Sequence, residues 1–130
     1  MRKLFKVVFI IFALLVILFT VFYFSIKSNL EALKNIQISD VDLNNAKDGT
    51  YMGSFKSTPV EAEVKVIIKN HRIESIEIVK HVTGKGKGAE VIPTKVVELQ
   101  SLKVDAVSGA TYSSKVILKA IENALKKSIK

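Results

Sequence analysis

The sequence predicts an α+β fold: an N-terminal transmembrane helix followed by a small domain of antiparallel strands covered by helices. Three observations support this prediction. Residues 7–24 contain no charged side chain. Residues 49–82 largely alternate apolar with polar side chains, as half-buried strands do, whereas residues 113–129 repeat apolar side chains at a helical period. Strands followed by a helix favour a sheet whose apolar face is covered by helices.

The uncharged segment at residues 7–24 is long enough to cross a membrane. It contains 18 residues, and with Leu4 and Phe5 it approaches the roughly 20 residues that span a hydrocarbon core. A cleaved signal peptide is the alternative, but it requires a shorter apolar region and small residues at its cleavage site. The segment that follows, Phe22–Lys27, offers no such site. We therefore expect an uncleaved transmembrane anchor.

Basic residues flank the anchor unequally. Arg2, Lys3 and Lys6 precede it, and Lys27 is the only nearby basic residue after it. Because basic segments tend to remain on the cytoplasmic side, residues 1–6 are expected to form a cytoplasmic tail. The prediction is a single-pass protein of the cell membrane with its folded domain on the extracytoplasmic side.

The composition narrows the range of partners. The formal net charge is +8, and removing the three basic residues of the tail leaves 17 basic against 12 acidic residues. We interpret this surplus as a solvated basic surface beside anionic membrane lipid. A nucleic-acid partner is not expected, because aromatic side chains are not interleaved with the lysines as stacking platforms require. The sequence has no cysteine, which excludes disulfides, thiolate catalysis and iron–sulfur ligation.

Residues 25–47 are predicted to be a stalk or linker, and residues 48–130 the folded domain. Leu30, Leu33 and Ile36 recur at helical spacing, which predicts a short helix that breaks near Ser39-Asp40. The polar stretch at residues 44–49 is typical of a turn region and is expected to open the domain.

Three strands are expected in the first half of the domain. Residues 49–55 alternate in polarity, and Pro59 ends the connection that follows. Ala62, Val64, Val66 and Ile68 fall on one face of the second strand, and Asn70-His71 forms a two-residue turn candidate. In the third strand, Ile73 is out of phase with Ile76 and Ile78, which suggests a bulge or a late strand start. The pattern predicts a three-stranded antiparallel meander.

The second half is predicted to supply the helices. The glycine-rich loop at residues 84–88 interrupts the strands, and Ala89 to Val91 is a candidate helical turn. Pro93 suits the first position of the next helix. A longer amphipathic helix is expected at residues 113–129, where Val116, Ile117 and Ile121 belong to one apolar stripe.

Four small residues, Ser108 to Thr111, directly precede this last helix. A helix that begins near Ser113 would leave its first N–H groups unpaired and its positive dipole end facing residues 109–112. A phosphate is stabilised at such a position, and small residues let it approach closely. Alternatively, Thr111, Ser113 or Ser114 merely caps the helix, as serine and threonine commonly do.

The same segment resembles the attachment motif of the FMN-binding domain family. The family pattern is an aspartate, two variable residues, Ser or Thr, then Gly, Ala and Thr or Ser, which Asp105, Ser108, Gly109, Ala110 and Thr111 match. The opening at residues 48–51 and the last helix also look like the family, so the resemblance covers roughly residues 48–129. It implies that Thr111 carries FMN through a phosphodiester bond, made by a separate flavin transferase that uses FAD and magnesium.

Further roles follow from this resemblance. Asp105 would help to orient the loop during attachment, or would only form the turn. Tyr112 and Tyr51 are candidates to contact the isoalloxazine ring, because aromatic faces stack well. Lys85 and Lys87 could offset the negative charge of a phosphate or reduced flavin, although a solvated, flexible loop is the simpler explanation for them. The two histidines, His71 and His81, have no Asp or Glu cluster at metal-ligand spacing, and no catalytic residue or metal site is expected.

The implied function is that of a membrane-anchored electron carrier, not a stand-alone enzyme. Related domains occur in flavoprotein subunits of sodium-pumping NADH:quinone oxidoreductases and Rnf complexes and in extracellular electron-transfer proteins. By that resemblance, the partners would be a flavin transferase and a membrane redox protein or quinone-linked complex. The alternative is a membrane-anchored binding or assembly module that never carries covalent flavin.

Overall fold

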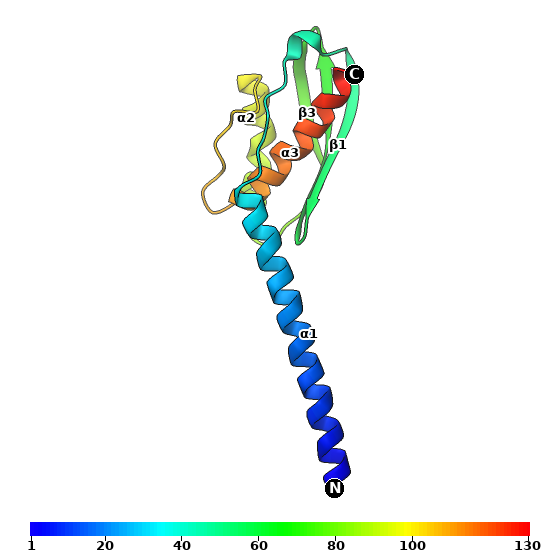
Figure 1. Ribbon diagram of the computed structural model, residues 1–130. Coiled ribbons are helices and arrows are strands. Elements are labelled where there is room, and N and C mark those ends of the chain that lie inside the picture. The colour runs from blue at the N-terminus through cyan, green and yellow to red at the C-terminus, as the bar shows by residue number, and fades with distance from the viewer.

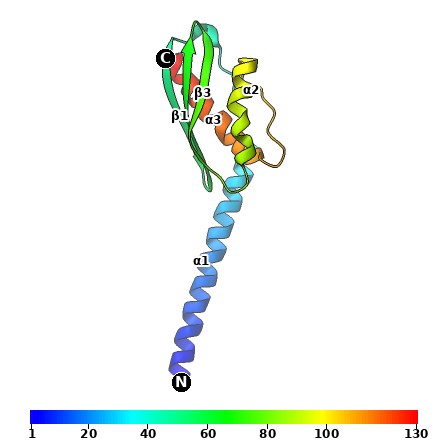
Figure 2. The same ribbon diagram turned by 180° about the vertical axis from the view of Figure 1, so that it is seen from behind.

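The computed structural model describes all 130 residues. A long helix projects from one end of a two-layer domain, in which two helices cover one face of a three-stranded sheet (Figures 1 and 2). The α+β prediction is therefore confirmed. The main elements are α1 (Arg2–Lys34), β1 (Gly49–Ser57), β2 (Val60–Lys69), β3 (Arg72–Val82), α2 (Ile92–Leu99) and α3 (Thr111–Ser128), with short 3-10 helices η1 (Leu43–Asn45) and η2 (Lys87–Val91).

Helix α1 joins the predicted anchor and the predicted stalk helix in one uninterrupted element of 33 residues. It is long and apolar enough to cross a membrane, and nearly all its large apolar side chains at residues 7–24 are exposed. The expected break near Ser39-Asp40 is wrong, because the helix ends at Lys34. Leu33 in its last turn is buried, so the last turn of the helix packs against the domain.

Part of the segment predicted as stalk or linker belongs to the domain core. Val41 and Ala46 are buried. The carboxylate of Asp40 accepts hydrogen bonds from the Leu102 N–H (3.0 Å) and the Ser101 hydroxyl (2.6 Å). Burial opposes ionisation of Asp40, but these hydrogen bonds outweigh it and lower its pKa. These contacts fix the start of the domain to the loop after α2.

The sheet has the order β1-β2-β3, and all its pairings are antiparallel. Ala62, Val64, Val66 and Ile68 on β2 are all buried, which confirms the predicted face. The alternate side chains of β2 remain partly exposed. Helix α3 packs across β1 and β2, and α2 packs against β3, so the core lies between the sheet and these two helices.

The predicted turn and bulge are both present. Asn70 and His71 have positive φ angles of 52° and 57°, as the common two-residue hairpin turn requires. On β3, Ser75 pairs with Ile67 and Ile73 pairs with Ile68, which leaves Glu74 as the extra residue of a bulge. This bulge explains why Ile73 is out of phase in the sequence. A second shift at Val79 rephases the end of β3.

Helix α3 carries a buried carboxylate, Glu122, whose side chain is 0% exposed. It accepts hydrogen bonds from Lys119 (2.8 Å) and Lys126, and from the Ser39 N–H (3.4 Å). Burial raises the pKa of this carboxyl, but the two lysines outweigh burial and the net effect is a lowered pKa. Glu122 therefore stays ionised in the core.

We expect the stability contributed by Glu122 to depend on pH. Because the pKa is lowered by folding, the contribution is complete above the unfolded value of about 4.3 and is lost as the pH falls through the folded value. Glu122→Gln should cost about 1–2 kcal/mol near pH 7, and this difference should shrink in acid. Thermal unfolding of the full chain in detergent across pH measures it, with the exposed Glu98→Gln as control. A difference that stays constant into acid would contradict the assignment.

Candidate functional site

The loop before α3 is a tight turn held by the helix that follows it. The Ala110 N–H donates to the Val107 carbonyl (2.9 Å), and Gly109 has a φ of 79°, a conformation that favours glycine at this turn position. The Ser114 hydroxyl accepts from the Val107 N–H (3.0 Å) and donates to the Ala110 carbonyl (2.8 Å). The buried Ser114 thereby fixes the loop to the first turn of α3.

Helix α3 begins at Thr111, two residues earlier than predicted. Its N-cap is Ala110 and no side chain caps it, so the alternative in which Thr111, Ser113 or Ser114 caps the helix is wrong. The first N–H groups of a helix have no intrahelical acceptor, and the first bond at this end runs from Ser114 N–H to Ala110. The exposed Thr111 side chain therefore lies among free N–H donors.

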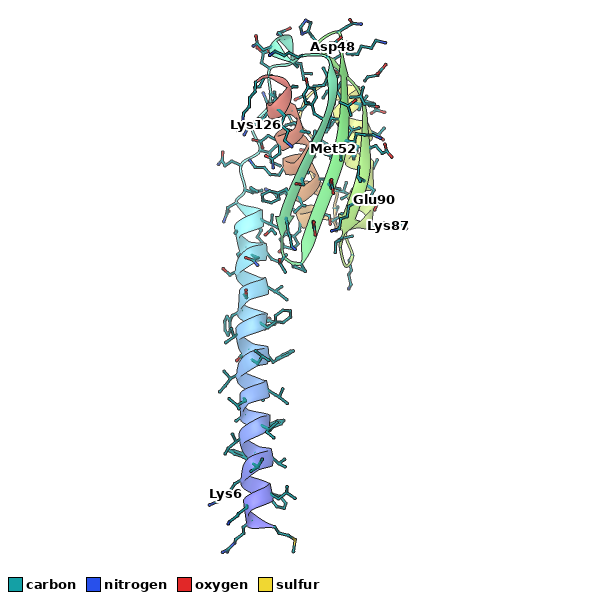
Figure 3. All side chains as sticks on the ribbon, turned by 90° about the vertical axis from the view of Figure 1, so that its right-hand side faces the viewer. Lys6, Asp48, Met52, Lys87, Glu90 and Lys126 are labelled. Atoms are coloured by element: carbon teal, nitrogen blue, oxygen red, sulfur yellow. The ribbon has the colours of Figure 1, made fainter.

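A pocket of about 200 Å³ lies beside Thr111. Its wall combines Leu30 of α1, Pro59 and Val60 at the turn between β1 and β2, Thr83 with residues 84–86 of the glycine-rich loop, and residues 109–113. These segments meet at the end of the domain from which α1 emerges (Figure 1). In Figure 3, Glu90 and Lys87 lie in the half of the domain nearer to α1, whereas Asp48 lies at the opposite end.

The structure brings together four of the six predicted site residues. Gly109, Ala110, Thr111 and Tyr112 line the pocket. The other two predicted residues do not line it: Ser108 is exposed in the turn, and the exposed Asp105 lines a separate hollow with Ile36 and Lys115.

The other candidate residues also include some that line the pocket and some that do not. Lys85 lines the pocket, whereas Lys87 begins η2. Tyr51 is not among the lining residues. It lies near the start of β1, where its hydroxyl donates to the Lys47 carbonyl (3.0 Å). Of the two tyrosines proposed to contact a ring, Tyr112 is the one that the fold places beside Thr111.

A buried hydrogen-bonded chain behind the pocket was not found from the sequence. His81, at the end of β3, has Nδ1 3.1 Å from Glu90 Oε1 and Nε2 3.1 Å from Ser113 Oγ. The chain continues from Ser113 Oγ to Thr83 Oγ1 (2.8 Å), which accepts from the Gly86 N–H (2.9 Å). The His81 side chain is 2% exposed. Ser113 and Thr83 both line the pocket.

Gly86 lets the glycine-rich loop contact α3 closely. A Cβ atom at this position would lie 1.9 Å from Ser113 Oγ and 2.4 Å from Thr83 Oγ1, which is inside any permitted contact. A histidine on the buried side of a strand, followed at once by a glycine-rich loop, was the available sequence signal for this chain. The bulge at Val79 obscured it, because it changes which face of the sheet His81 occupies.

Comparison with known families agrees with the geometry. The family model of the FMN-binding domain matches residues 56–126, which is more than half of the chain and includes the pocket loops and most of α3. The chain belongs to the FMN-binding domain family. The resemblance stated from the motif is thereby confirmed.

One similar curated protein has no described function. An uncharacterized protein of Treponema pallidum (strain Nichols) is 33% identical over 82 residues, which cover 61% of this chain and 23% of the relative. The chain thus spans about a quarter of that relative's length. The activity of this FMN-binding domain protein is therefore inferred from its own site.

The residues of the site fit a flavin phosphate. The free N–H groups at the start of α3 and the positive end of its dipole suit an anion. Gly109 and Ala110 present little bulk on the approach to Thr111, and Lys85 is the one charged residue among the lining side chains. No carboxylate lines the pocket. The free Thr111 hydroxyl thus lies beside N–H groups that suit an anion.

Proposed function

We propose that this protein is a membrane-anchored, extracytoplasmic electron carrier that bears FMN in phosphodiester linkage to Thr111. The observation that carries the proposal is the position of Thr111. Thr111 is the first residue of α3, and its side chain is exposed and makes no hydrogen bond. The residue lines the pocket of an FMN-binding domain. A hydroxyl in that position is accessible to an enzyme and lies next to donors that hold the phosphate.

The attachment reaction balances with FAD as the flavin donor. The Thr111 oxygen would form a new ester bond to the FMN phosphorus while the pyrophosphate bond of FAD breaks and AMP leaves. A threonine hydroxyl is a weak nucleophile that requires activation by a base or metal. No side chain hydrogen-bonds to Thr111 in this fold, which supports a separate flavin transferase as the source of that activation.

The redox chemistry would belong to the flavin, while the protein orients it and sets its surroundings. The phosphodiester would hold the phosphate at α3, and Tyr112 would offer an aromatic face beside it. A covalent bond also keeps the cofactor with its carrier outside the cell, where a dissociated flavin would be diluted.

The position of the pocket beside α1 supports a membrane redox partner. Leu30 lines the pocket and lies six residues beyond the apolar segment that ends at Phe24. At a rise of 1.5 Å per residue, that separation is about 9 Å along α1. Contacts between the domain and α1 support this placement, including the Lys115 Nζ donation to the Lys34 carbonyl (2.9 Å). We propose that electrons pass between a partner in the membrane and an acceptor outside the cell.

Intact-mass measurement of the full chain tests the proposal. Co-expression with a flavin transferase should add one FMN less one water to the wild-type chain, and production without the transferase should add nothing. The modified chain should keep its flavin fluorescence in a denaturing gel, because the ester bond survives unfolding. An unmodified chain from the native host with its transferase active would instead favour an anchored binding or assembly module, and fluorescence lost on denaturation would indicate noncovalent FMN.

A further inference from the structure

The glycine-rich loop is held in place at its middle residue, Gly86. The Gly86 N–H donates to Thr83 Oγ1 (2.9 Å), and the Gly86 carbonyl accepts from the Ala89 N–H (3.0 Å). Gly86 is buried, whereas Lys85 and Lys87 on either side of it are exposed. The loop is thus bonded to its neighbours on both sides, and it is not the fully solvated, flexible segment that its glycines alone suggest.

Both lysines of this loop lack a carboxylate partner. Neither Lys85 nor Lys87 takes part in any ion pair of the fold. Two acidic side chains on the neighbouring elements are already bonded elsewhere. Glu90 of η2 lies 3.1 Å from His81 Nδ1, and Glu61 of β2 is paired with two lysines of the sheet. The loop therefore presents two positive charges that no carboxylate of the domain pairs with.

The loop lies at the end of the domain from which the apolar helix emerges. Lys85 and Leu30 of α1 line the same pocket, and Leu30 lies about 9 Å along α1 beyond Phe24, where the apolar segment ends. Figure 3 shows Lys87 in the half of the domain nearer to α1. Lipid headgroups extend about 5–8 Å beyond each side of the hydrocarbon core. When α1 spans a membrane, this end of the domain therefore lies next to the headgroups.

We infer that the glycine-rich loop binds the membrane surface, where Lys85 and Lys87 contact the headgroups of anionic lipids. A basic segment is attracted to an anionic leaflet within about one Debye length, roughly 8 Å at physiological salt. Lys27, three residues beyond Phe24, adds a positive charge in the same layer. Because a single transmembrane helix does not fix its own tilt, this second contact holds the domain in one orientation. The inference rests on the membrane anchor of the proposed function and does not require flavin.

Fluorescence quenching of the full, flavin-free chain in lipid nanodiscs tests this contact. Because the chain has no cysteine, Gly84→Cys supplies a single site for a fluorophore, and a Cβ atom there meets no atom within 4 Å. The discs contain phosphatidylcholine alone or mixed with phosphatidylglycerol, and both include a phosphatidylcholine with a quenching nitroxide on its headgroup. Quenching should be stronger with phosphatidylglycerol. The difference should vanish in about 1 M salt, where the Debye length is about 3 Å.

Lys87→Gln is the decisive variant, because Lys85 also lines the pocket and Lys87 does not. In discs with phosphatidylglycerol, Lys87→Gln should lower the ratio of headgroup-bound to free loop by about fivefold. Lys69→Gln removes an exposed lysine at the far end of β2 and should leave this ratio unchanged. A fluorophore on Thr50→Cys, near the start of β1, should be quenched equally in both lipid compositions.

Three results would refute the contact between the loop and anionic lipid. They are equal quenching at the loop in the two lipid compositions, a lipid difference that persists in high salt, and equal effects of Lys87→Gln and Lys69→Gln. A chain that does not enter the discs would refute the membrane anchor as well, and that failure is recognised earlier, when protein and lipid do not elute together. If the anchored chain never carries flavin, the electron-carrier proposal fails alone, because the quenching experiment uses the flavin-free chain.

Discussion

Thr111→Ala is expected to carry no covalent flavin under conditions in which the transferase loads the wild-type chain fully. Alanine lacks the oxygen that forms the ester bond, and no other pocket hydroxyl is both exposed and placed at the helix start. Ser113 is buried, and Ser108 does not line the pocket. The Thr111 side chain is exposed and unbonded, so its removal should change stability by less than about 0.5 kcal/mol. Intact mass and thermal unfolding measure the two effects separately.

Two further variants make this result specific. Thr111→Ser keeps the hydroxyl at the same backbone position and should restore a mass gain of one FMN less one water. Thr50→Ala removes an exposed threonine near the start of β1, away from the pocket, and should load as the wild type does. Covalent flavin on Thr111→Ala would assign the bond to another residue and would refute the proposed attachment site.

The sheet was predictable because its signals are local. Alternation along β2 depends only on neighbouring residues, and the turn at Asn70-His71 needs two residues that tolerate positive φ. Ile73 is out of phase with Ile76 and Ile78 because Glu74 is the extra residue of a bulge, so the sequence itself showed the bulge. The motif was equally local, since its small residues directly precede the helix whose N-terminus they leave open.

The features that the sequence did not predict depend on contacts between distant segments. The last turn of α1 packs on the domain through the buried Leu33. The pocket is completed by Leu30 and Pro59, which come from α1 and a hairpin turn. His81 and Ser113 are 32 positions apart, and only the fold brings the end of β3 within hydrogen-bond distance of the start of α3. Periodicity shows that each segment has a buried face, but it does not show which polar groups meet there.

The packing of α3 on the sheet also fixes the position of Thr111 at the helix start. Gly53 of β1 lies directly under the middle of α3, where a Cβ atom would stand 2.1 Å from the Ala120 carbonyl oxygen and 2.6 Å from the Ala124 nitrogen. Both are backbone atoms, so no side-chain rotation can relieve the contact. The Asn123 amide and Lys127 Nζ hold α3 to β1 on either side of this crossing by donating to the Ser54 and Met52 carbonyls (2.9 and 2.6 Å).

Gly53→Ala is therefore expected to destabilise the domain by about 3 kcal/mol or more, at the upper end of overpacking effects. For a domain of this size, the melting temperature should fall by at least about 12 °C. Because α3 must move away from β1 to admit the methyl group, the loop around Thr111 should also lose protection from hydrogen exchange.

Gly84→Ala is the matched control for this change. A Cβ atom at Gly84 meets no atom within 4 Å, although the residue lies in the loop that lines the pocket. The substitution should leave the melting temperature close to that of the wild type. Equal melting temperatures for Gly53→Ala and Gly84→Ala would show that α3 does not pack on β1 at this distance. The rigid placement of Thr111 against the sheet would then lose its physical basis, since the same contact positions the whole helix.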